Sequence, residues 1–328
     1  MYLASPDALT STTFFRLTSD VRIRLDEAIA ELGTGYVADA TQALRGNNEI
    51  LLRAQAIVDR SQPDLARLTV VEGRYQTAAS ALRSINEISA EAALAAQSAD
   101  ESSGATGQAV AATEARSTIA SVLSTLNTQF GGRALFAGDT GVGTAVTDVD
   151  SFIAWVEGLV AGSTDAATNR AILDTEFDVG GQFDTIVYTG GAALSDTTLP
   201  GGEVVDALPT AEESSIRDIL KGLAIVAVND SIDITEREQW IADGASLVQT
   251  ARDRLTTIEA SLGLALNSIE RAIDRQDQVL FDAQTTIDSL IGVDPFESVS
   301  ETQSLETRLQ ALYTVTGRSA ALRLTNFL

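Results

Sequence analysis

The sequence of 328 residues contains neither cysteine nor histidine. Without these side chains, disulfide bridges, thiol nucleophiles, imidazole bases and the usual zinc ligands are excluded. The sequence also has no Gly-x-Ser-x-Gly elbow and no phosphate-binding P-loop, and its many carboxylates show no catalytic pairing. We therefore expect a protein that is not an enzyme, with no catalytic residues, no cofactor and no metal ion.

Aromatic residues and basic residues are also scarce. Aromatics make up 5% of the sequence, Lys221 is its sole lysine, and the formal net charge is −24. Binding to nucleic acid or to an anionic membrane surface needs clustered cations, so neither partner is expected. The apolar content of 45% is nevertheless too high for a wholly disordered chain.

Long apolar runs are missing as well. No run of about 18 apolar residues occurs, and residues 1–20 lack a basic segment followed by an apolar one. We expect no membrane insertion and no conventional signal peptide, so export from the cell would need another route.

Apolar residues recur three and four apart near both ends of the sequence, which places them on one stripe of a helix at each end. An apolar final stretch is expected to be buried rather than frayed in solvent. Each terminal helix therefore needs a partner. The residues of the two stripes are Phe14, Leu17, Val21, Leu25, Leu32, Leu305, Leu309, Leu312, Leu322, Leu324, Phe327 and Leu328.

Two further stretches, 68–85 and 248–283, carry the seven-residue apolar repeat of a coiled-coil seam. The second lies in a proline-free segment from about Thr235 to Ile291. A helix of that length spans roughly 80 Å at about 1.5 Å per residue, more than a compact domain can bury. The sequence therefore predicts an extended helical rod.

Breaks in the helical period give the remaining boundaries. A second helix is expected from about Glu49, interrupted or kinked at Pro63, which cannot donate the backbone bond of a helix interior. A turn is predicted at 102–107. A third helix should end at Gly131-Gly132, because glycine favours helix ends.

Residues 139–210 differ from the rest, since they are rich in Gly, Thr and Asp. Apolar alternations at 185–188 and 203–205, flanked by Gly and Pro, predict short strands, and helices are expected at 151–160, 166–173 and 214–226. This segment is predicted to be an α+β insert.

Together the patterns predict a mainly α fold. It is a long antiparallel coiled-coil-like helical bundle built from both ends of the chain, with a central α+β insert domain. The predicted parts are an N-terminal helix in 1–45, the two halves of the rod in 46–138 and 213–291, the insert in 139–212, and a C-terminal helix in 292–328.

Several short segments resemble one protein family. Residues 132–138 (GRALFAG) are similar to the Gly-Arg-Tyr-aliphatic-Phe-Ala-Gly segment of flagellar junction proteins, where filament flagellins have a Gln-Phe-Asn-Gly type instead. Further segments similar to the family lie at 94–100, 188–191, 216–223 and 322–328. In this order they resemble the flagellin superfamily, and within it most of all the flagellar hook-filament junction proteins, also called hook-associated protein 3.

The resemblance implies a structural subunit of the bacterial flagellum. It would join hook to filament by axial polymerisation, act outside the cell, and leave the cell by the flagellar type III route. The resemblance also implies that helices 1–45 and 292–328 are disordered in the monomer and fold during assembly, so that the stripe residues become subunit contacts. The implied partners are copies of the chain in a ring, flagellin, the preceding hook-associated junction protein and a type III export chaperone.

Two other functions remain open. One is a filament flagellin, which shares the fold. The other is a secreted coiled-coil adhesin or phage-tail-like rod, because heptad stripes also occur in ordinary oligomeric coiled coils.

Overall fold

The computed structural model describes residues 6–102, 104–141 and 143–325, and side chains within 12–98, 104–141 and 143–318. The chain divides into two compact units. We call Met1–Pro63 with Gln276–Leu328 the terminal unit, and Asp64–Arg275 the central unit.

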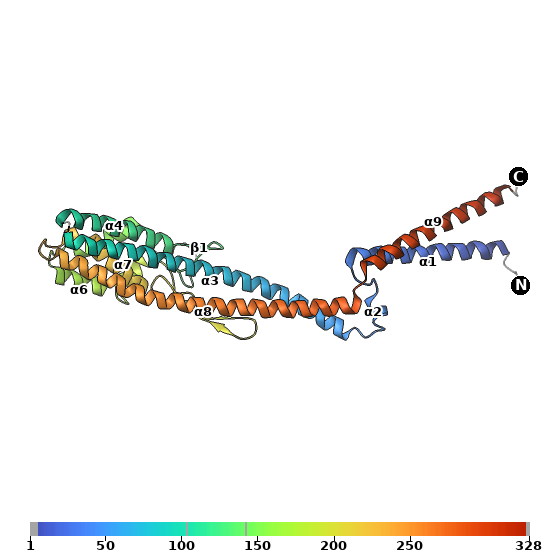
Figure 1. Cartoon of the computed structure of the whole chain (residues 1–328), viewed down its shortest axis with the longest axis horizontal. Helices are drawn as coiled ribbons and strands as arrows, with labels where there is room; N and C mark the ends of the chain where they lie inside the picture. The colour runs from blue at the N-terminus through green and yellow to red at the C-terminus, as the bar shows by residue number, and fades with distance from the viewer. Residues whose placement is uncertain (1–5, 103, 142, 326–328) are drawn as a thin grey trace. The chain divides into compact units, whose positions relative to one another are not determined.

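The described residues are mainly helical (Figure 1). Long helices come from both ends of the sequence and a small α+β region lies between them, so the predicted fold class is confirmed. The helices are α1 (Pro6–Thr34), α2 (Ala40–Ala43), α3 (Glu49–Ser102), α4 (Gly104–Leu126), α5 (Val149–Val160), α6 (Ala166–Glu176), α7 (Ser214–Ala227), α8 (Arg237–Ile291) and α9 (Pro295–Thr325), with short turns η1 (Phe183–Val187) and η2 (Asn229–Ser231). Two antiparallel hairpins pair β1 (Gln129–Phe130) with β2 (Arg133–Ala134) and β3 (Thr197–Thr198) with β4 (Val204–Val205).

In the terminal unit, apolar residues form two small clusters. In the first, α1 packs against α9. In the second, residues near α2 and at the start of α3 pack on the last turns of α8. The buried members are Leu25, Ala28 and Leu305 in the first cluster, and Leu51, Ala54, Ile287 and Ile291 in the second.

In the central unit, one continuous apolar core joins the long helices to the residues of the predicted insert. Phe152 on α5, Phe177 and Phe183 are fully or almost fully buried, and neighbouring ring centroids with Trp155 lie 5.0 to 6.5 Å apart. These aromatic rings belong to the same cluster as Leu82 and the side chains of α4, α7 and α8. Four aromatic residues of the predicted insert therefore pack together in the core of the central unit.

The segment at 132–138 has a clear structural role in this unit. Phe136 is fully buried, and its carbonyl oxygen accepts the backbone N–H of Ala211 at 2.9 Å. Gly138 adopts a φ of 61°, and a Cβ there would collide with the carbonyl oxygen of Ala192. Only glycine fits this combination of positive φ and close backbone approach.

The similar segment at 188–191 lies directly against it. Gly191 donates its backbone N–H to the Ala137 carbonyl at 2.9 Å, and Asp139 donates to Ala192 at 2.9 Å. The Tyr188 hydroxyl donates to the Gly191 carbonyl at 2.6 Å. Two segments recognised separately in the sequence therefore form one backbone-to-backbone junction.

Of the two alternatives predicted at Pro63, an interruption is excluded, because α3 continues through that residue to Ser102. Two predicted boundaries are wrong. Gly107 lies buried inside α4 rather than in a turn. Helix α4 ends at Leu126, and Gly131 and Gly132, at φ of 59° and 79°, form the two-residue turn between β1 and β2, which requires positive φ at both positions.

One prediction within the insert is also wrong, the strand at 185–188. Residues 185–188 fall largely in the π-helical turn η1, and only Tyr188 forms a β-bridge, to Val146. The strand at 204–205 and the three helices α5, α6 and α7 are confirmed. Short apolar runs do not distinguish a strand from a buried helical turn, which explains the error.

Helix α8 confirms the proline-free rod, and most of its predicted seam is buried. Buried seam residues include Val248, Leu255, Leu262 and Ile269, whereas Val279 is 44% exposed. The C-terminal helix begins at Pro295, which stands in its first turn, where a missing N–H costs nothing.

Candidate assembly surface

The contact between α1 and α9 is narrow. Leu25, Ala28 and Leu305 are buried in it, and Val21 and Leu309 pack alongside. The two helices run antiparallel, and they separate towards Pro6 and Thr325 (Figure 1). Each terminal helix thus has the other as its partner within the chain, over part of its length.

The predicted stripe residues are only partly covered by this contact. Phe14, Val21, Leu309 and Leu312 are half-buried, whereas Leu17 and Leu32 remain exposed at 48% and 42%. The side chains of Leu322 and Leu324, and the whole of Phe327 and Leu328, lie outside the described residues.

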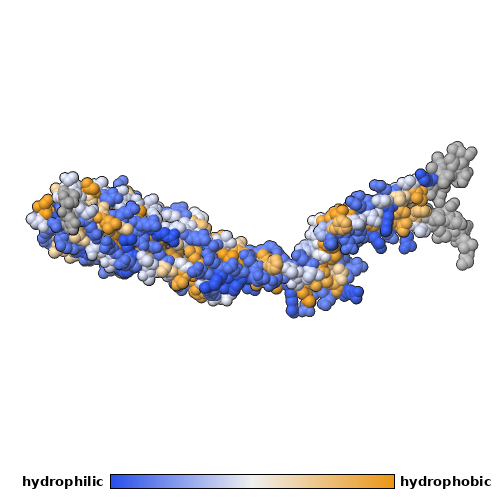
Figure 2. Space-filling view, in the orientation of Figure 1, coloured by the Kyte–Doolittle hydropathy of each residue, from blue (hydrophilic) through white to orange (hydrophobic). Residues whose placement is uncertain are grey.

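Sequence reasoning missed a second group of apolar residues on the same helices. Phe15 is 74% exposed, Phe296 is 84% exposed and Tyr313 is 55% exposed. Figure 2 shows apolar patches over this pair of helices. These residues do not lie on the predicted stripes. Searching the other faces of α1 and α9 for apolar residues would have identified them from the sequence.

A short backbone bridge holds the base of α1 against the start of α9. Val37 donates its backbone N–H to Ile291 at 2.8 Å, and Val293 donates to Gly35 at 3.0 Å. The Tyr36 hydroxyl donates to Asp288 at 3.1 Å, and this hydrogen bond raises the pKa of Tyr36 above its usual value. The segment 35–37 that follows α1 is therefore hydrogen-bonded to the segment 291–293 that precedes α9.

The second cluster of the terminal unit also leaves apolar residues uncovered. Ile50 and Leu52, on the first turn of α3, are 54% and 62% exposed, and Phe281 on α8 is 62% exposed. Exposed apolar residues occurring close together mark surfaces that bind other proteins. The terminal unit has such residues at both of its clusters.

A depression of about 620 Å³ with charged walls lies in the central unit. Lys221 lies between Asp174 at 3.0 Å and Asp218 at 3.2 Å, and Arg254 lies 2.6 Å from Asp218. These ion pairs join α6, α7 and α8, so the charges of this depression serve to hold three helices together.

Arg217, also at this depression, is almost fully buried. Its guanidinium lies 2.9 Å from Asp184 and 5.2 Å from the centre of the Phe183 ring, and it donates to the carbonyl of Glu212 at 3.1 Å. A buried cation needs such partners to offset the loss of hydration. Its role is to connect α7 with η1.

Within 6–102, 104–141 and 143–325, no group of three or more carboxylates is arranged to hold a metal ion. In the same residues, no helix combines the length and the apolar character needed to cross a membrane.

These features define a class of protein: a mainly helical chain with long helices, in which α1 pairs with α9 and much of the described apolar surface of both helices stays exposed. No model of a known protein family and no curated protein sequence matches the chain. Among solved structures, FlgL of Bacillus cereus is similar with a TM-score of 0.37 and 13% identity, over 75% of this chain and 99% of that one.

A putative flagellar hook-associated protein from Vibrio parahaemolyticus is similar with a TM-score of 0.37 and 15% identity, over 76% of this chain and 92% of that one. At this TM-score and these identities, the likeness does not decide what this chain does.

Proposed function

We propose that this chain is a structural, non-enzymatic subunit of the bacterial flagellum that joins the hook to the filament. The main support is the order of the five segments similar to the hook-filament junction proteins. Two of these segments, 132–138 and 188–191, are joined by the hydrogen bond from the Gly191 backbone N–H to the Ala137 carbonyl. The chain would be exported by the flagellar type III route and act outside the cell.

The second support is the uncovered apolar surface of α1 and α9. Exposed apolar side chains such as Phe15 and Phe296 stabilise a complex when another molecule covers them, because their apolar surface is then removed from water. Neighbouring subunits are the natural cover, so the stripe residues Phe14, Leu17, Val21, Leu25, Leu32, Leu305, Leu309, Leu312, Leu322, Leu324, Phe327 and Leu328 are proposed to be subunit contacts.

The proposed partners follow from this role. They are further copies of the chain in a ring, flagellin on one side, the preceding hook-associated junction protein on the other, and an export chaperone that covers the apolar ends before assembly. The terminal segments 1–45 and 292–328 would be disordered in the monomer and become ordered when neighbours bind.

The insert 139–212 is proposed to face solvent in the assembly. Among its charged residues, Arg170 is the only basic one, and like charge on an outer surface suppresses lateral aggregation.

Immunogold electron microscopy of intact flagella, with an antibody against this chain, tests the proposal. Label confined to a short band between hook and filament is expected. Label along the whole filament would instead identify a filament flagellin. Flagella without label would contradict both functions and favour a secreted coiled-coil adhesin or phage-tail-like rod.

A further inference from the structure

Charges are segregated along the α1/α9 pair. The half of the pair that contains residues 6–25 and 307–325 is basic, and we call it the basic end. The half that contains residues 26–34 and 295–306 is acidic, and we call it the acidic end. Among the described side chains, the basic end carries Arg16, Arg22, Arg24, Arg308 and Arg318 against Asp20. The acidic end carries Asp26, Glu27, Glu31, Glu297, Glu301 and Glu306 and no cation.

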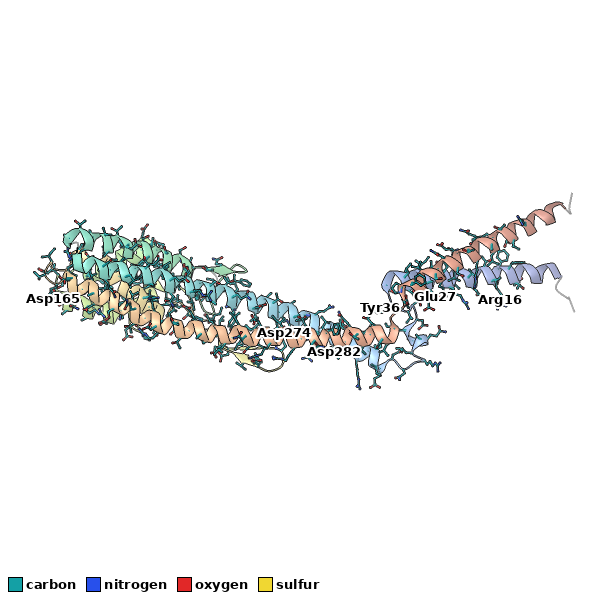
Figure 3. The ribbon with its side chains drawn as sticks, in the orientation of Figure 1. Arg16, Glu27, Tyr36, Asp165, Asp274 and Asp282 are labelled. Carbon is teal, nitrogen blue, oxygen red and sulfur yellow. The ribbon has the colours of Figure 1, made fainter. Side chains whose placement is uncertain are left out.

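The antiparallel pairing places the like-charged segments of the two helices side by side. Because Leu25 packs with Leu305, the basic residues of α1 lie beside the basic residues of α9, and the same holds for the acidic residues. Figure 3 shows Arg16 and Glu27 at different positions along α1, with Glu27 nearer to the joint at Tyr36. Each helix is already segregated along its own length, and the antiparallel pairing brings the two basic segments together and the two acidic segments together.

In the described part of the chain, none of the side chains of the two ends takes part in an ion pair. Arg16, Arg308 and Arg318 are exposed, as are Glu27, Glu297 and Glu301. Both ends therefore present free charge of opposite sign to other molecules.

Apolar residues accompany the charges at both ends. Phe15 and Tyr313 are 74% and 55% exposed at the basic end. Ile29 and Phe296 are 49% and 84% exposed at the acidic end. Each end thus combines apolar area, which supplies affinity, with charge, which selects the partner and its direction.

We propose that the acidic end of one copy docks the basic end of a second copy, so that subunits associate head to tail. Two copies meeting basic end to basic end, or acidic end to acidic end, place like charges against each other and are disfavoured. The proposal deepens the assembly role proposed above and rests on it, because it assigns a direction to contacts between copies.

The dependence of self-association on salt concentration distinguishes charge-directed docking from purely apolar association. Attraction between exposed charges extends about 10 Å at 0.1 M ionic strength and about 3 Å at 1 M. Apolar association does not weaken with added sodium chloride. Self-association of the full chain, followed by sedimentation velocity, is therefore expected to weaken at least about tenfold between 0.05 M and 1 M salt.

Charge reversal gives the decisive test. Arg308→Glu with Arg318→Glu lowers the formal charge of the basic end from +4 to 0, and Glu297→Arg with Glu301→Arg reduces that of the acidic end from −6 to −2. Because each double variant removes most of the attraction between unlike ends, self-association of each alone is expected to weaken at least about tenfold. A one-to-one mixture of the two is expected to associate, because the second variant offers basic surfaces to the acidic surfaces of the first.

A control matched to the arginine variant is Arg67→Glu with Arg83→Glu, which lowers the net charge by the same four units on exposed positions of α3 and should leave association intact. Circular dichroism checks that every variant keeps its helix content. Persistent self-association of both reversed variants, a mixture that stays monomeric, or a wild-type chain that is monomeric at its highest soluble concentration would each overturn the proposal.

The two proposals fail differently. If Phe15→Asp abolishes association while both charge reversals leave it unchanged, assembly through the terminal helices stands and the head-to-tail direction is wrong. If the immunogold label is absent from flagella but the mixture of reversed variants associates, the direction stands and the flagellar role is wrong.

Discussion

Tyr188 connects two distant parts of the central unit. Its ring is almost fully buried, and its hydroxyl donates to Gly191 beside the junction with residues 137–139. Burial, with a smaller contribution from the charge of Glu212, raises the pKa of Tyr188 to about 12. An ionised tyrosine is therefore poorly tolerated at this position.

This shift predicts a loss of stability at high pH. The folded pKa is above the unfolded value, so the stabilisation is complete below about pH 10 and is lost as the pH rises to about 12. Tyr188 alone should lower the free energy of unfolding by about 1–2 kcal/mol over this range. Denaturant titrations followed by circular dichroism at a series of pH values measure the effect.

The control for Tyr188 is Tyr188→Phe, which keeps the ring and removes the titrating group. This variant should start with a lower free energy of unfolding at neutral pH, by about 1 kcal/mol for the lost hydrogen bond. It should then lose less stability than the wild type towards pH 12. Equal pH dependence in both proteins would show that Tyr188 does not titrate in this way.

At the scale of elements, the contact between α7 and α8 depends on two glycines. Gly222 and Gly244 are both buried, and a Cβ on Gly244 would lie 2.9 Å from the carbonyl oxygen of Gly222 and 2.9 Å from the side chains of Ile225 and Val226. The helices can approach this closely only where neither has a side chain. Trp240 reinforces the contact by donating to the Ile225 carbonyl at 2.6 Å.

Two alanine substitutions in α8 should therefore have opposite effects. Gly244→Ala should lower the free energy of unfolding by about 1–2 kcal/mol, because overpacking outweighs the gain in helix propensity. Gly263→Ala, where a Cβ would meet nothing within 4 Å, should raise it by about 0.5–1 kcal/mol. Urea unfolding of both variants measures the two values, and a shift of the same sign in both would contradict the packing argument.

The terminal helices are the elements least supported by burial. Helices α1 and α9 span 29 and 31 residues, yet the described core between them is Leu25, Ala28 and Leu305. Burying a leucine contributes about 2 kcal/mol. Ordering the backbone costs about 1–2 kcal/mol per residue before helix hydrogen bonds are counted. Two leucines offset little of that cost.

Hydrogen exchange of the isolated monomer tests this imbalance. Backbone amides of α1 and α9 should exchange at least about tenfold faster than those of the buried part of α8, residues 245–270. Conditions that promote assembly should slow exchange in α1 and α9 specifically. Equal protection of all three helices in the monomer would contradict the expected disorder of the chain ends.

At the scale of the molecule, the two units differ in how much core they have. The central unit holds one continuous apolar cluster, whereas the terminal unit holds two small ones. A fragment of residues 64–275 should therefore fold alone and unfold cooperatively, with a midpoint temperature within about 5 °C of the main transition of the full chain. Differential scanning calorimetry of the two proteins makes the comparison. A fragment that shows no cooperative transition would contradict this expectation.

Several features could be predicted because they depend on neighbours in the sequence. The period of apolar residues in 237–291 and the helices α5, α6 and α7 follow from local spacing, and all of them were predicted. The glycines at 131 and 132 indicated a break correctly but not its kind. A helix end and a hairpin turn both favour glycine, and only the pairing of Phe130 with Arg133 distinguishes them.

The candidate assembly surface could be predicted only in part. The apolar stripes of α1 and α9 are visible in the sequence, but which of their residues become covered is not. Leu25 is buried while Leu17, on the same stripe, is 48% exposed, because the helices meet near Leu305 and then separate. The insert at 139–212 stays a predicted domain, although its aromatic residues share the core of the central unit.

The sequence by itself determined the absence of thiol and imidazole chemistry, the long helices and the order of the recognised segments, since each depends on composition or on residues close in the chain. Tertiary structure alone decided that α1 pairs with α9 in antiparallel register, which gathers arginines at one end and carboxylates at the other. It also brought Gly138 against Ala192. The physical reason is that these contacts join residues far apart in the sequence, and their register depends on packing across the whole fold.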